Sequence, residues 1–159
     1  MASGEVLSSG GKLSRTRFIR NAVSVLVLLF SMGVTSARGD SMQIVQSLWT
    51  FRSKLEVNCT LPSWDNSSDH CSWPGITCNA SGAITRIQFS GYNCSGEINE
   101  AITNITTLEK LDLSWNSIAQ KFPIYLTELP NLQELDLGIN NLTGELPPEI
   151  GNFTSLELL

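Results

Sequence analysis

The sequence predicts an α/β solenoid whose short parallel strands line a concave face. Two observations carry this prediction. Apolar residues in the second half of the chain recur every 24 residues, and each recurrence opens with leucines that alternate with polar residues. Ahead of the repeats, residues 41–57 have Ile44, Leu48, Phe51 and Leu55 at the spacing of an amphipathic helix.

The repeat is clearest in the segments LEKLDLSWN (108–116) and LQELDLGIN (132–140). An earlier copy begins at Ile84, and a fourth begins at Leu156. The pattern L-x-x-L-x-L-x-x-N at this spacing is the signature of a leucine-rich repeat. The alternative is one amphipathic helix with leucines three and four residues apart, which does not explain why the copies agree position by position.

Each unit is expected to open with a short strand. Leu111 and Leu113 would point inward and Lys110, Asp112 and Ser114 outward, because successive strand side chains alternate between faces. One unit cannot bury its own leucines, whereas stacked neighbours bury a continuous core.

An asparagine follows each of the two clearest strands, Asn116 in one unit and Asn140 in the next. The turn there leaves inward backbone groups that no strand pairing satisfies. A side-chain amide both donates and accepts hydrogen bonds, so it can satisfy such groups. We therefore expect these two asparagines to point inward. Later apolar positions, such as Leu142, Leu146 and Ile150, would cover the returning side of the coil.

Residues 1–37 have the features of a secretory signal peptide. A basic segment precedes the apolar run 22–34, and small residues follow up to Ala37. The apolar run is shorter than the roughly 20 residues that span a bilayer. We expect cleavage after Ala37, with Gly39 as the second choice and an uncleaved signal anchor as the alternative.

Removal of this leader makes the chain more acidic. Six basic and fourteen acidic residues remain, a formal net charge of −8. No second apolar run of about 20 residues follows, so we expect no membrane span after cleavage. The negative charge also argues against nucleic acid or an anionic membrane as a partner.

Many asparagines lie in N-x-S/T sequons, the acceptor sites of N-glycosylation. Together with the leader they predict a glycoprotein that is secreted or lies at the extracellular face of the plasma membrane. The sequons are at Asn58, Asn66, Asn79, Asn93, Asn104, Asn141 and Asn152.

The segment GELPPEIGNFTSLELL, which begins at Gly144, resembles the repeat G-x-I-P-x-x-L-G-x-L-x-x-L-x-x-L of plant extracellular leucine-rich-repeat proteins. Upstream, Trp64 and the motif C-x-W-x-G-[IV]-x-C at 71–78 resemble the N-terminal cap of that family. The resemblance implies a helical, disulfide-stapled cap over 38–82. Three 24-residue repeats and the start of a fourth would then fill 83–159.

Three residues depart from the family pattern. Tyr92 stands where the ladder asparagine belongs, Asn99 replaces the proline, and Gln120 replaces the glycine. The first two lie in the repeat beside the cap, where atypical units are expected.

The cysteines Cys59, Cys71, Cys78 and Cys94 would meet an oxidising compartment after secretion. Zinc usually needs four ligands at closer cysteine spacing, and a redox site favours C-x-x-C. In a secreted repeat protein we therefore expect Cys71 and Cys78 to form a structural disulfide that closes the cap. Cys94 occupies the inward slot that Ile118 holds in the next unit. A buried Cys94 with a separate Cys59 is the favoured interpretation, and a second bridge is the alternative.

Catalysis finds little support in the sequence. His70 is the lone histidine and lies in a turn-rich loop, where a surface role is expected. Asp112 and Asp136 on adjacent strands could be interpreted as a glycosidase pair. Outward strand positions of such arrays are freely polar, however, so we expect no enzymatic activity, no cofactor and no metal.

The outward strand residues instead predict a recognition surface on the concave face. Just past the strands, Trp115 and Ile139 hold equivalent positions, and Trp115 would either meet a ligand or pack on the neighbouring coil. The candidate contacts are Arg86, Gln88, Lys110, Asp112, Trp115, Glu134 and Asp136.

The resemblance implies the N-terminal part of the ectodomain of a receptor-like kinase or receptor-like protein. Such an ectodomain binds an extracellular peptide or protein, a small signal, or a partner receptor such as a co-receptor. A transmembrane helix and often a serine/threonine kinase follow in such receptors. The alternatives are a secreted inhibitor of a cell-wall-degrading enzyme and a truncated product without binding activity.

The sequence stops at Leu159, inside the fourth unit, without the polar terminal cap that such arrays need. Apolar side chains from Leu132 onward would then have no following coil to cover them. We therefore expect residues 38–159, expressed alone, to be poorly folded or prone to aggregation.

Overall fold

The computed structural model describes residues 42–55 and 58–159, which lie in the second of two compact units of the chain, Ser41–Leu159. The expected leader and both expected cleavage sites lie outside the described residues. Within the described ranges, no helix is both long enough and apolar enough to cross a membrane.

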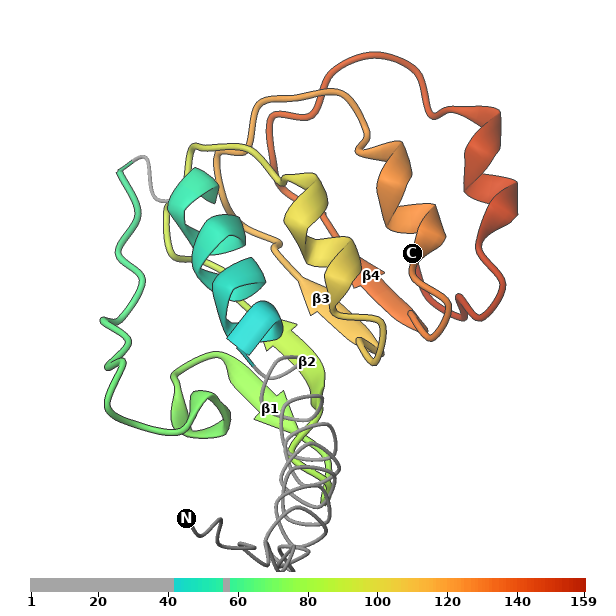
Figure 1. Ribbon diagram of the computed structural model, residues 1–159. Helices are drawn as coiled ribbons and strands as arrows, with labels where there is room; N and C mark the ends of the chain where they lie inside the picture. The colour runs from blue at the N-terminus through green and yellow to red at the C-terminus, as the bar shows by residue number, and fades with distance from the viewer. Residues whose placement is uncertain (1–41, 56–57) are drawn as a thin grey trace, which may run out of the picture. The chain divides into compact units, whose positions relative to one another are not determined.

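Four short strands form one sheet in the order β1-β2-β3-β4 (Figure 1). The first pair is antiparallel and the other two pairs are parallel. In the parallel pairs Ile87 lies beside Leu111, and Leu111 beside Leu135, so the 24-residue period is the step from one strand to the next. The strands are β1 (Ile76–Cys78), β2 (Ile84–Gln88), β3 (Lys110–Asp112) and β4 (Glu134–Asp136). This arrangement confirms the predicted leucine-rich-repeat solenoid.

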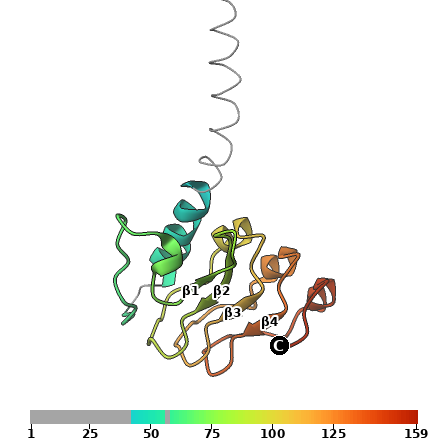
Figure 2. The ribbon, with the colours of Figure 1, turned by 90° about the horizontal axis from the view of Figure 1, so that it is seen from below.

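Short 3-10 helices return the chain to the start of the next strand. Three of them also recur every 24 residues: η2 (Glu100–Asn104), η3 (Ile124–Glu128) and η4 (Pro148–Asn152). They lie in a row with the N-terminal helix, residues 42–55, on one side of the sheet (Figures 1 and 2). Each repeat is therefore a strand, a turn and a 3-10 return. The remaining helix, η1 (His70–Ser72), lies in the cap.

The core lies between the sheet and this row of helices. Leu111 and Leu113 are fully buried, as the alternation predicts. Ser114 lies on the side of the outward Asp112, as expected, but it is only 5% exposed. Its hydroxyl lies 2.8 Å from the Ser90 hydroxyl and donates to Asp112 Oδ1 at 2.7 Å, so hydrogen bonds compensate its burial.

The last coil covers more of the core than the sequence suggests. Leu132 and Leu135 are 0% and 1% exposed. The chain after η4 extends the sheet, because Leu158 bridges Glu134 and the Leu135 N–H donates to the Leu158 carbonyl at 3.0 Å. Leu146, expected to cover the returning side of its coil, is instead 65% exposed.

Asparagine amides join successive coils as the sequence predicts. Asn116 Oδ1 accepts from the Cys94 N–H at 2.9 Å, and its Nδ2 donates to the Phe89 and Leu113 carbonyls at 2.7 and 2.9 Å. Asn140 repeats the arrangement one coil later, accepting from the Ile118 N–H at 3.0 Å and donating to the Leu113 carbonyl at 2.9 Å. Each amide thus satisfies backbone groups of its own coil and of the coil before it.

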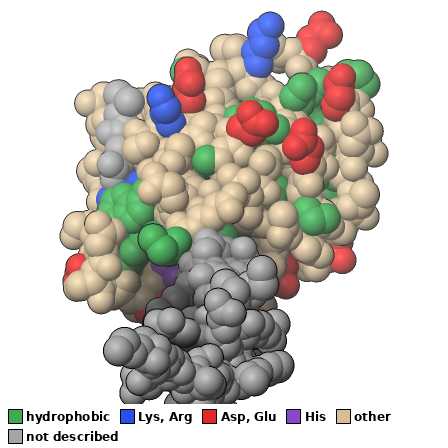
Figure 3. Space-filling model, viewed as in Figure 1, with side chains coloured by type: hydrophobic (Ala, Val, Ile, Leu, Met, Phe, Trp, Pro, Cys, Tyr) green, Lys and Arg blue, Asp and Glu red, His purple; other side chains and the backbone are tan. Residues whose placement is uncertain are grey.

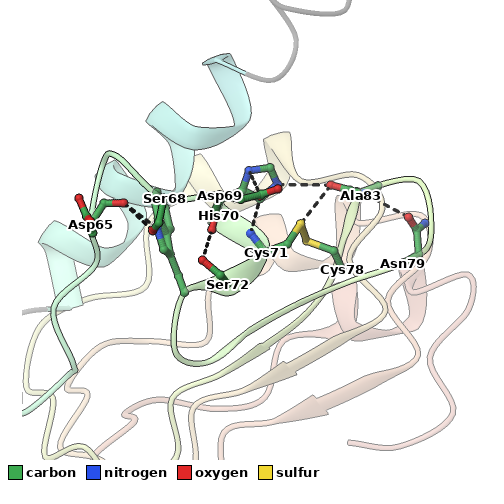
Figure 4. A network of polar contacts seen from close by, with 11 residues as sticks. Asp65, Ser68, Asp69, His70, Cys71, Ser72, Cys78, Asn79 and Ala83 are labelled. Carbon is green, nitrogen blue, oxygen red and sulfur yellow. Dashed lines mark hydrogen bonds and ion pairs between the residues drawn. A yellow bond between two sulfur atoms is a disulfide. The ribbon is translucent and has the colours of Figure 1, made fainter.

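The cap is closed by a disulfide between Cys71 and Cys78, which joins η1 to β1 (Figure 4). Asp69 caps η1, because its carboxylate accepts from the Cys71 N–H at 2.9 Å. The Asn79 side chain holds the following turn, accepting from the Ser81 and Ala83 N–H groups at 3.0 and 3.1 Å. The staple therefore lies within a loop that its own side chains already order.

A second disulfide joins Cys59 to Cys94, so the favoured interpretation of a separate Cys59 is wrong. Cys94 is buried in the expected inward slot, and the bridge ties the cap segment around Cys59 to the first repeat. Beside the bridge, the Thr60 N–H donates to the Tyr92 carbonyl at 2.8 Å. Tyr92 stands at the position of the ladder asparagine. In later coils that asparagine bonds the preceding coil, and here the cap segment makes the bond to the coil instead.

The helix of the cap is held by an aromatic cluster. Its apolar face is buried as predicted, with Leu48, Phe51 and Leu55 at most 1% exposed. Arg52 is also buried, and its guanidinium lies 4.6 Å from the centre of the Trp64 ring and donates to the Pro62 carbonyl at 2.7 Å. Burial of this charge is thus offset by a cation–π contact and by hydrogen bonds.

The end of that helix touches the first repeat at Gly96. The Glu97 N–H donates to the Lys54 carbonyl at 2.9 Å, and a Cβ atom at Gly96 would lie 1.8 Å from the same oxygen. A glycine is therefore required for this close approach of two backbones.

We predict that Gly96→Ala lowers the free energy of unfolding by about 3 kcal/mol, because the clash is with backbone and cannot be relieved by a rotamer change. Urea denaturation of the secreted chain, followed by tryptophan fluorescence, measures this. Gly151→Ala is the matched control, because no atom lies within 4 Å of a Cβ there. Equal urea midpoints for the two variants would contradict the predicted contact.

Candidate recognition surface

The outward side chains of β2, β3 and β4 form two columns across the sheet, which we call the strand face. Strand register places Arg86, Lys110 and Glu134 side by side in the first column. The second column is Gln88, Asp112 and Asp136. The structure thus brings together the six strand positions that the sequence predicts as contacts.

The first column contains an ion pair between neighbouring strands. The Lys110 ammonium donates to the Glu134 carboxylate. This hydrogen bond, and then the charges of Lys110 and Arg86, hold the pKa of the Glu134 carboxyl below its ordinary value, although partial desolvation opposes them. Lys110 and Glu134 therefore largely neutralise one another.

The second column presents two carboxylates on adjacent strands. Asp112 Oδ1 accepts from the Ser114 N–H at 3.1 Å, and Asp136 Oδ1 accepts from the Gly138 N–H at 2.9 Å. The same turn geometry thus orients both side chains. Residues two positions beyond the strand hold these carboxylates in place, which favours a structural origin for the pair.

Trp115 and Ile139 lie just past the strands, at equivalent positions of successive coils. Their side chains are 65% and 63% exposed, so Trp115 does not pack into the neighbouring coil. The Trp115 N–H donates to the Gly138 carbonyl at 2.9 Å, and the Asn116 N–H donates to the Ile139 carbonyl at 3.1 Å. These backbone bonds fix the two residues on adjoining coils at one edge of the strand face.

Sequence reasoning missed one feature of this surface, the hydroxyl pair of Ser90 and Ser114 between the second column and the Trp115 edge. The two serines are 24 residues apart, and Gly138 follows at the same spacing. That period could have identified them as a third column.

The helix side of the protein has a different character. Figure 3 shows charged side chains gathered along its upper edge and hydrophobic ones at scattered places. Half-buried Tyr125 of η3 lies on this side and donates from its hydroxyl to the Ile98 carbonyl. Burial raises the pKa of Tyr125 to about 12. Its hydroxyl therefore serves to join two coils and is a poor proton donor for chemistry near neutral pH.

All seven sequon asparagines are exposed, so their surroundings leave room for glycans. None of them lies within β2, β3 or β4. A fully glycosylated chain would thus keep its strand positions free of attached sugar.

One group in the described part of the chain has metal-ligand side chains close together. Ligand atoms of His70, Cys71 and Cys78 lie within 4.8 Å of one another. Both sulfur atoms belong to the cap disulfide, however, and disulfide sulfur lacks the thiolate that binds zinc. The group therefore does not fit a metal site.

Known protein families match both the cap and the repeats of this chain. Residues 45–79 match the family described as "Leucine rich repeat N-terminal domain". Residues 107–129 and 131–153 each match the family described as "Leucine Rich Repeat". These segments coincide with the cap and with the coils that carry β3 and β4.

Among curated proteins, MDIS1-interacting receptor like kinase 1 of Arabidopsis thaliana is 29% identical over 121 residues. The chain belongs to the plant extracellular leucine-rich-repeat family. The alignment covers 62% of this chain and 12% of that kinase, so the chain spans a small part of the length of this relative.

Solved structures of this family agree with the fold. The BIR3–SERK2 complex from Arabidopsis thaliana superposes with a TM-score of 0.64 at 29% identity, covering 72% of this chain and 65% of that chain. The PEPR1–AtPEP1 structure superposes with a TM-score of 0.63 at 26% identity, covering 72% of this chain and 17% of that chain. The chain therefore has the fold of the leucine-rich-repeat ectodomains of plant receptors.

We predict that the coupling free energy between Lys110 and Glu134 is favourable at pH 7 and vanishes in acid. The pKa of Glu134 is lowered in the folded protein, so the contribution of the pair is present above the ordinary carboxyl pKa. It is lost as the pH falls through the lowered value. A double-mutant cycle of Lys110→Met and Glu134→Gln tests this. The free energy of unfolding is measured by urea denaturation at pH 7 and at a pH below the lowered pKa of Glu134, each at two salt concentrations. A coupling that is unchanged in acid or in high salt would contradict the ionic origin of the contact.

Proposed function

We propose that this chain is the N-terminal part of a plant leucine-rich-repeat receptor ectodomain, and that its strand face recognises an extracellular peptide or a partner protein. On this proposal residues 1–37 are a cleaved leader, 38–82 the cap and 83–159 the repeats. The protein would act at the outer face of the plasma membrane as part of a longer receptor, with glycans on the exposed sequons.

The observation that carries the proposal is the register of the strand face. Backbone pairing fixes the positions from which the side chains of both columns project. The ion pair and the turn hydrogen bonds orient four of these six side chains, so a partner would meet a partly preorganised surface. Arg86, Gln88 and Asp136 are exposed there, and Trp115 adds an exposed aromatic ring at the edge. Aromatic and arginine side chains are enriched at protein interfaces.

The relatives support the same assignment. BIR3 and PEPR1 are each found in complex with another molecule, SERK2 and AtPEP1 respectively. By analogy, recognition through the repeat ectodomain fits this chain better than catalysis. Its exposed carboxylates are explained by turn hydrogen bonds, and His70 lies away from them in the cap.

A glycan placed on the strand face tests the proposal. Gln88→Asn creates the sequon N-F-S on β2, and Ala101→Asn creates N-I-T in η2 on the helix side. A yeast-displayed library of random dodecapeptides is selected for binding to the secreted wild-type chain. We predict that selected peptides bind the Gln88→Asn glycoform at least about tenfold more weakly, because the glycan covers the sheet.

The Ala101→Asn glycoform is the matched control and should bind the same peptides like the wild type. Occupancy of both new sequons is verified by intact mass. Failure to select any peptide, or selected peptides that bind the Gln88→Asn glycoform at full strength, would overturn the assignment of recognition to the strand face.

A further inference from the structure

Two bulky apolar residues occupy a backbone conformation that disfavours them. Trp115 and Ile139 have φ values of 55° and 53°, in the left-handed region. That region is unfavourable for L-residues, and a β-branched residue such as isoleucine is a genuine outlier there. Gly91 holds the equivalent place in the first repeat with φ of 74°, so a glycine there is enough to form the turn of the coil.

Side-chain burial does not offset this strain, because Trp115 and Ile139 are both mostly exposed. Their apolar surface is therefore available to something outside the chain. Strained backbone persists mainly at sites where it serves binding or chemistry. Backbone hydrogen bonds hold the two residues on neighbouring coils, so both present apolar side chains at the same edge of the strand face.

The surface next to this edge is negatively charged. Lys110 is paired with Glu134, which leaves the carboxylates of Asp112 and Asp136 as the excess charge of β3 and β4. Turn hydrogen bonds to Oδ1 orient both carboxylates. Between them and the apolar edge lie only the small side chain of Ser114 and the bare backbone of Gly138. A partner backbone can therefore approach closely here.

We propose that this part of the strand face docks an extended segment of a partner that places an apolar side chain on Trp115 and Ile139 and a lysine or arginine at Asp112 and Asp136. The inference rests on the proposed function and specifies the partner chemistry. In an extended chain, side chains two residues apart lie on the same side, about 6.7 Å apart. The simplest partner segment therefore carries one apolar and one basic residue two positions apart, so that both face the protein.

The test uses two acetylated and amidated octapeptides. The first is Gly-Ser-Phe-Ser-Arg-Ser-Gly-Ser, and the second carries Glu in place of Arg. Binding is followed through the indole N–H signal of Trp115 in the ¹⁵N-labelled secreted chain, assigned with Trp115→Phe. We expect the Arg peptide to shift this signal saturably and the Glu peptide to bind at least about fivefold more weakly.

Charge reversal makes the test specific. Asp136→Lys places a positive charge beside Asp112 and should abolish the preference between the two peptides, whereas Glu128→Lys in η3 makes the same change of charge on the helix side and should leave it unaltered. Asp112→Asn is avoided because it would create the sequon N-L-S. Ile139→Gly should weaken both peptides and raise the urea midpoint, because it removes the apolar contact and the backbone strain together.

Equal affinity of the two peptides for the wild type, an unshifted Trp115 signal with both, or an Asp136→Lys variant that keeps the original preference would overturn the proposal. The proposal would also be overturned if the peptides selected from the library lack the apolar and basic pair and yet bind the Gln88→Asn glycoform more weakly than the wild type. That result would leave the proposed recognition function in place. Loss of that glycan effect would instead overturn the proposed function itself.

Discussion

The structure depends on the amide links between one coil and the next. A single coil of this chain has one short strand and one 3-10 turn, and it can neither bury its leucines nor satisfy its inward backbone groups. Stacking on a neighbouring coil buries the leucines. Asn116 and Asn140 satisfy the backbone groups, because each bonds carbonyls in two coils and accepts an N–H from the previous one. These bonds fix the separation of the coils, and the separation fixes the strand register. The columns of the strand face follow from that register.

The first repeat has no coil before it, and the cap takes over that role by other means. A disulfide joins Cys59 to Cys94, the Thr60 N–H bonds the Tyr92 carbonyl, and the Lys54 carbonyl accepts from the backbone beyond Gly96. Asn99, at the place of the family proline, caps η2 through its side-chain oxygen and donates from Nδ2 to the Thr50 carbonyl at 3.0 Å. The departures from the repeat pattern at Tyr92 and Asn99 thus coincide with contacts to the cap.

Sequence reasoning succeeds where a physical requirement repeats. The leucines of the strands, the two ladder asparagines and the outward columns recur every 24 residues, so each copy supports the others. Sequence reasoning fails at contacts that occur only once in the chain and so have no repeated copy to support them. Cys59 has no periodic counterpart, and only the fold brings it to Cys94. The sequence pattern predicts Ser114 as an exposed polar residue, whereas its burial depends on the Ser90 hydroxyl one coil away. Leu132 and Leu135 are buried by the short start of the fourth unit, where Leu158 pairs with Glu134 at the same 24-residue step, so the expectation that they lack cover is wrong. The exposure of Trp115 follows from a left-handed backbone, which its residue type argues against.

The central claim is that the asparagine links make the coils one cooperative structure. Native-state hydrogen exchange of the Cys94 and Ile118 amides tests this directly, since these N–H groups donate to Asn116 and Asn140. The account predicts that both amides exchange only through global opening, with the same opening free energy as the buried strand amides and the same dependence on denaturant. Exchange of either amide by local opening, well below the stability of the strands, would show that the coils are held by leucine packing alone and would contradict the account.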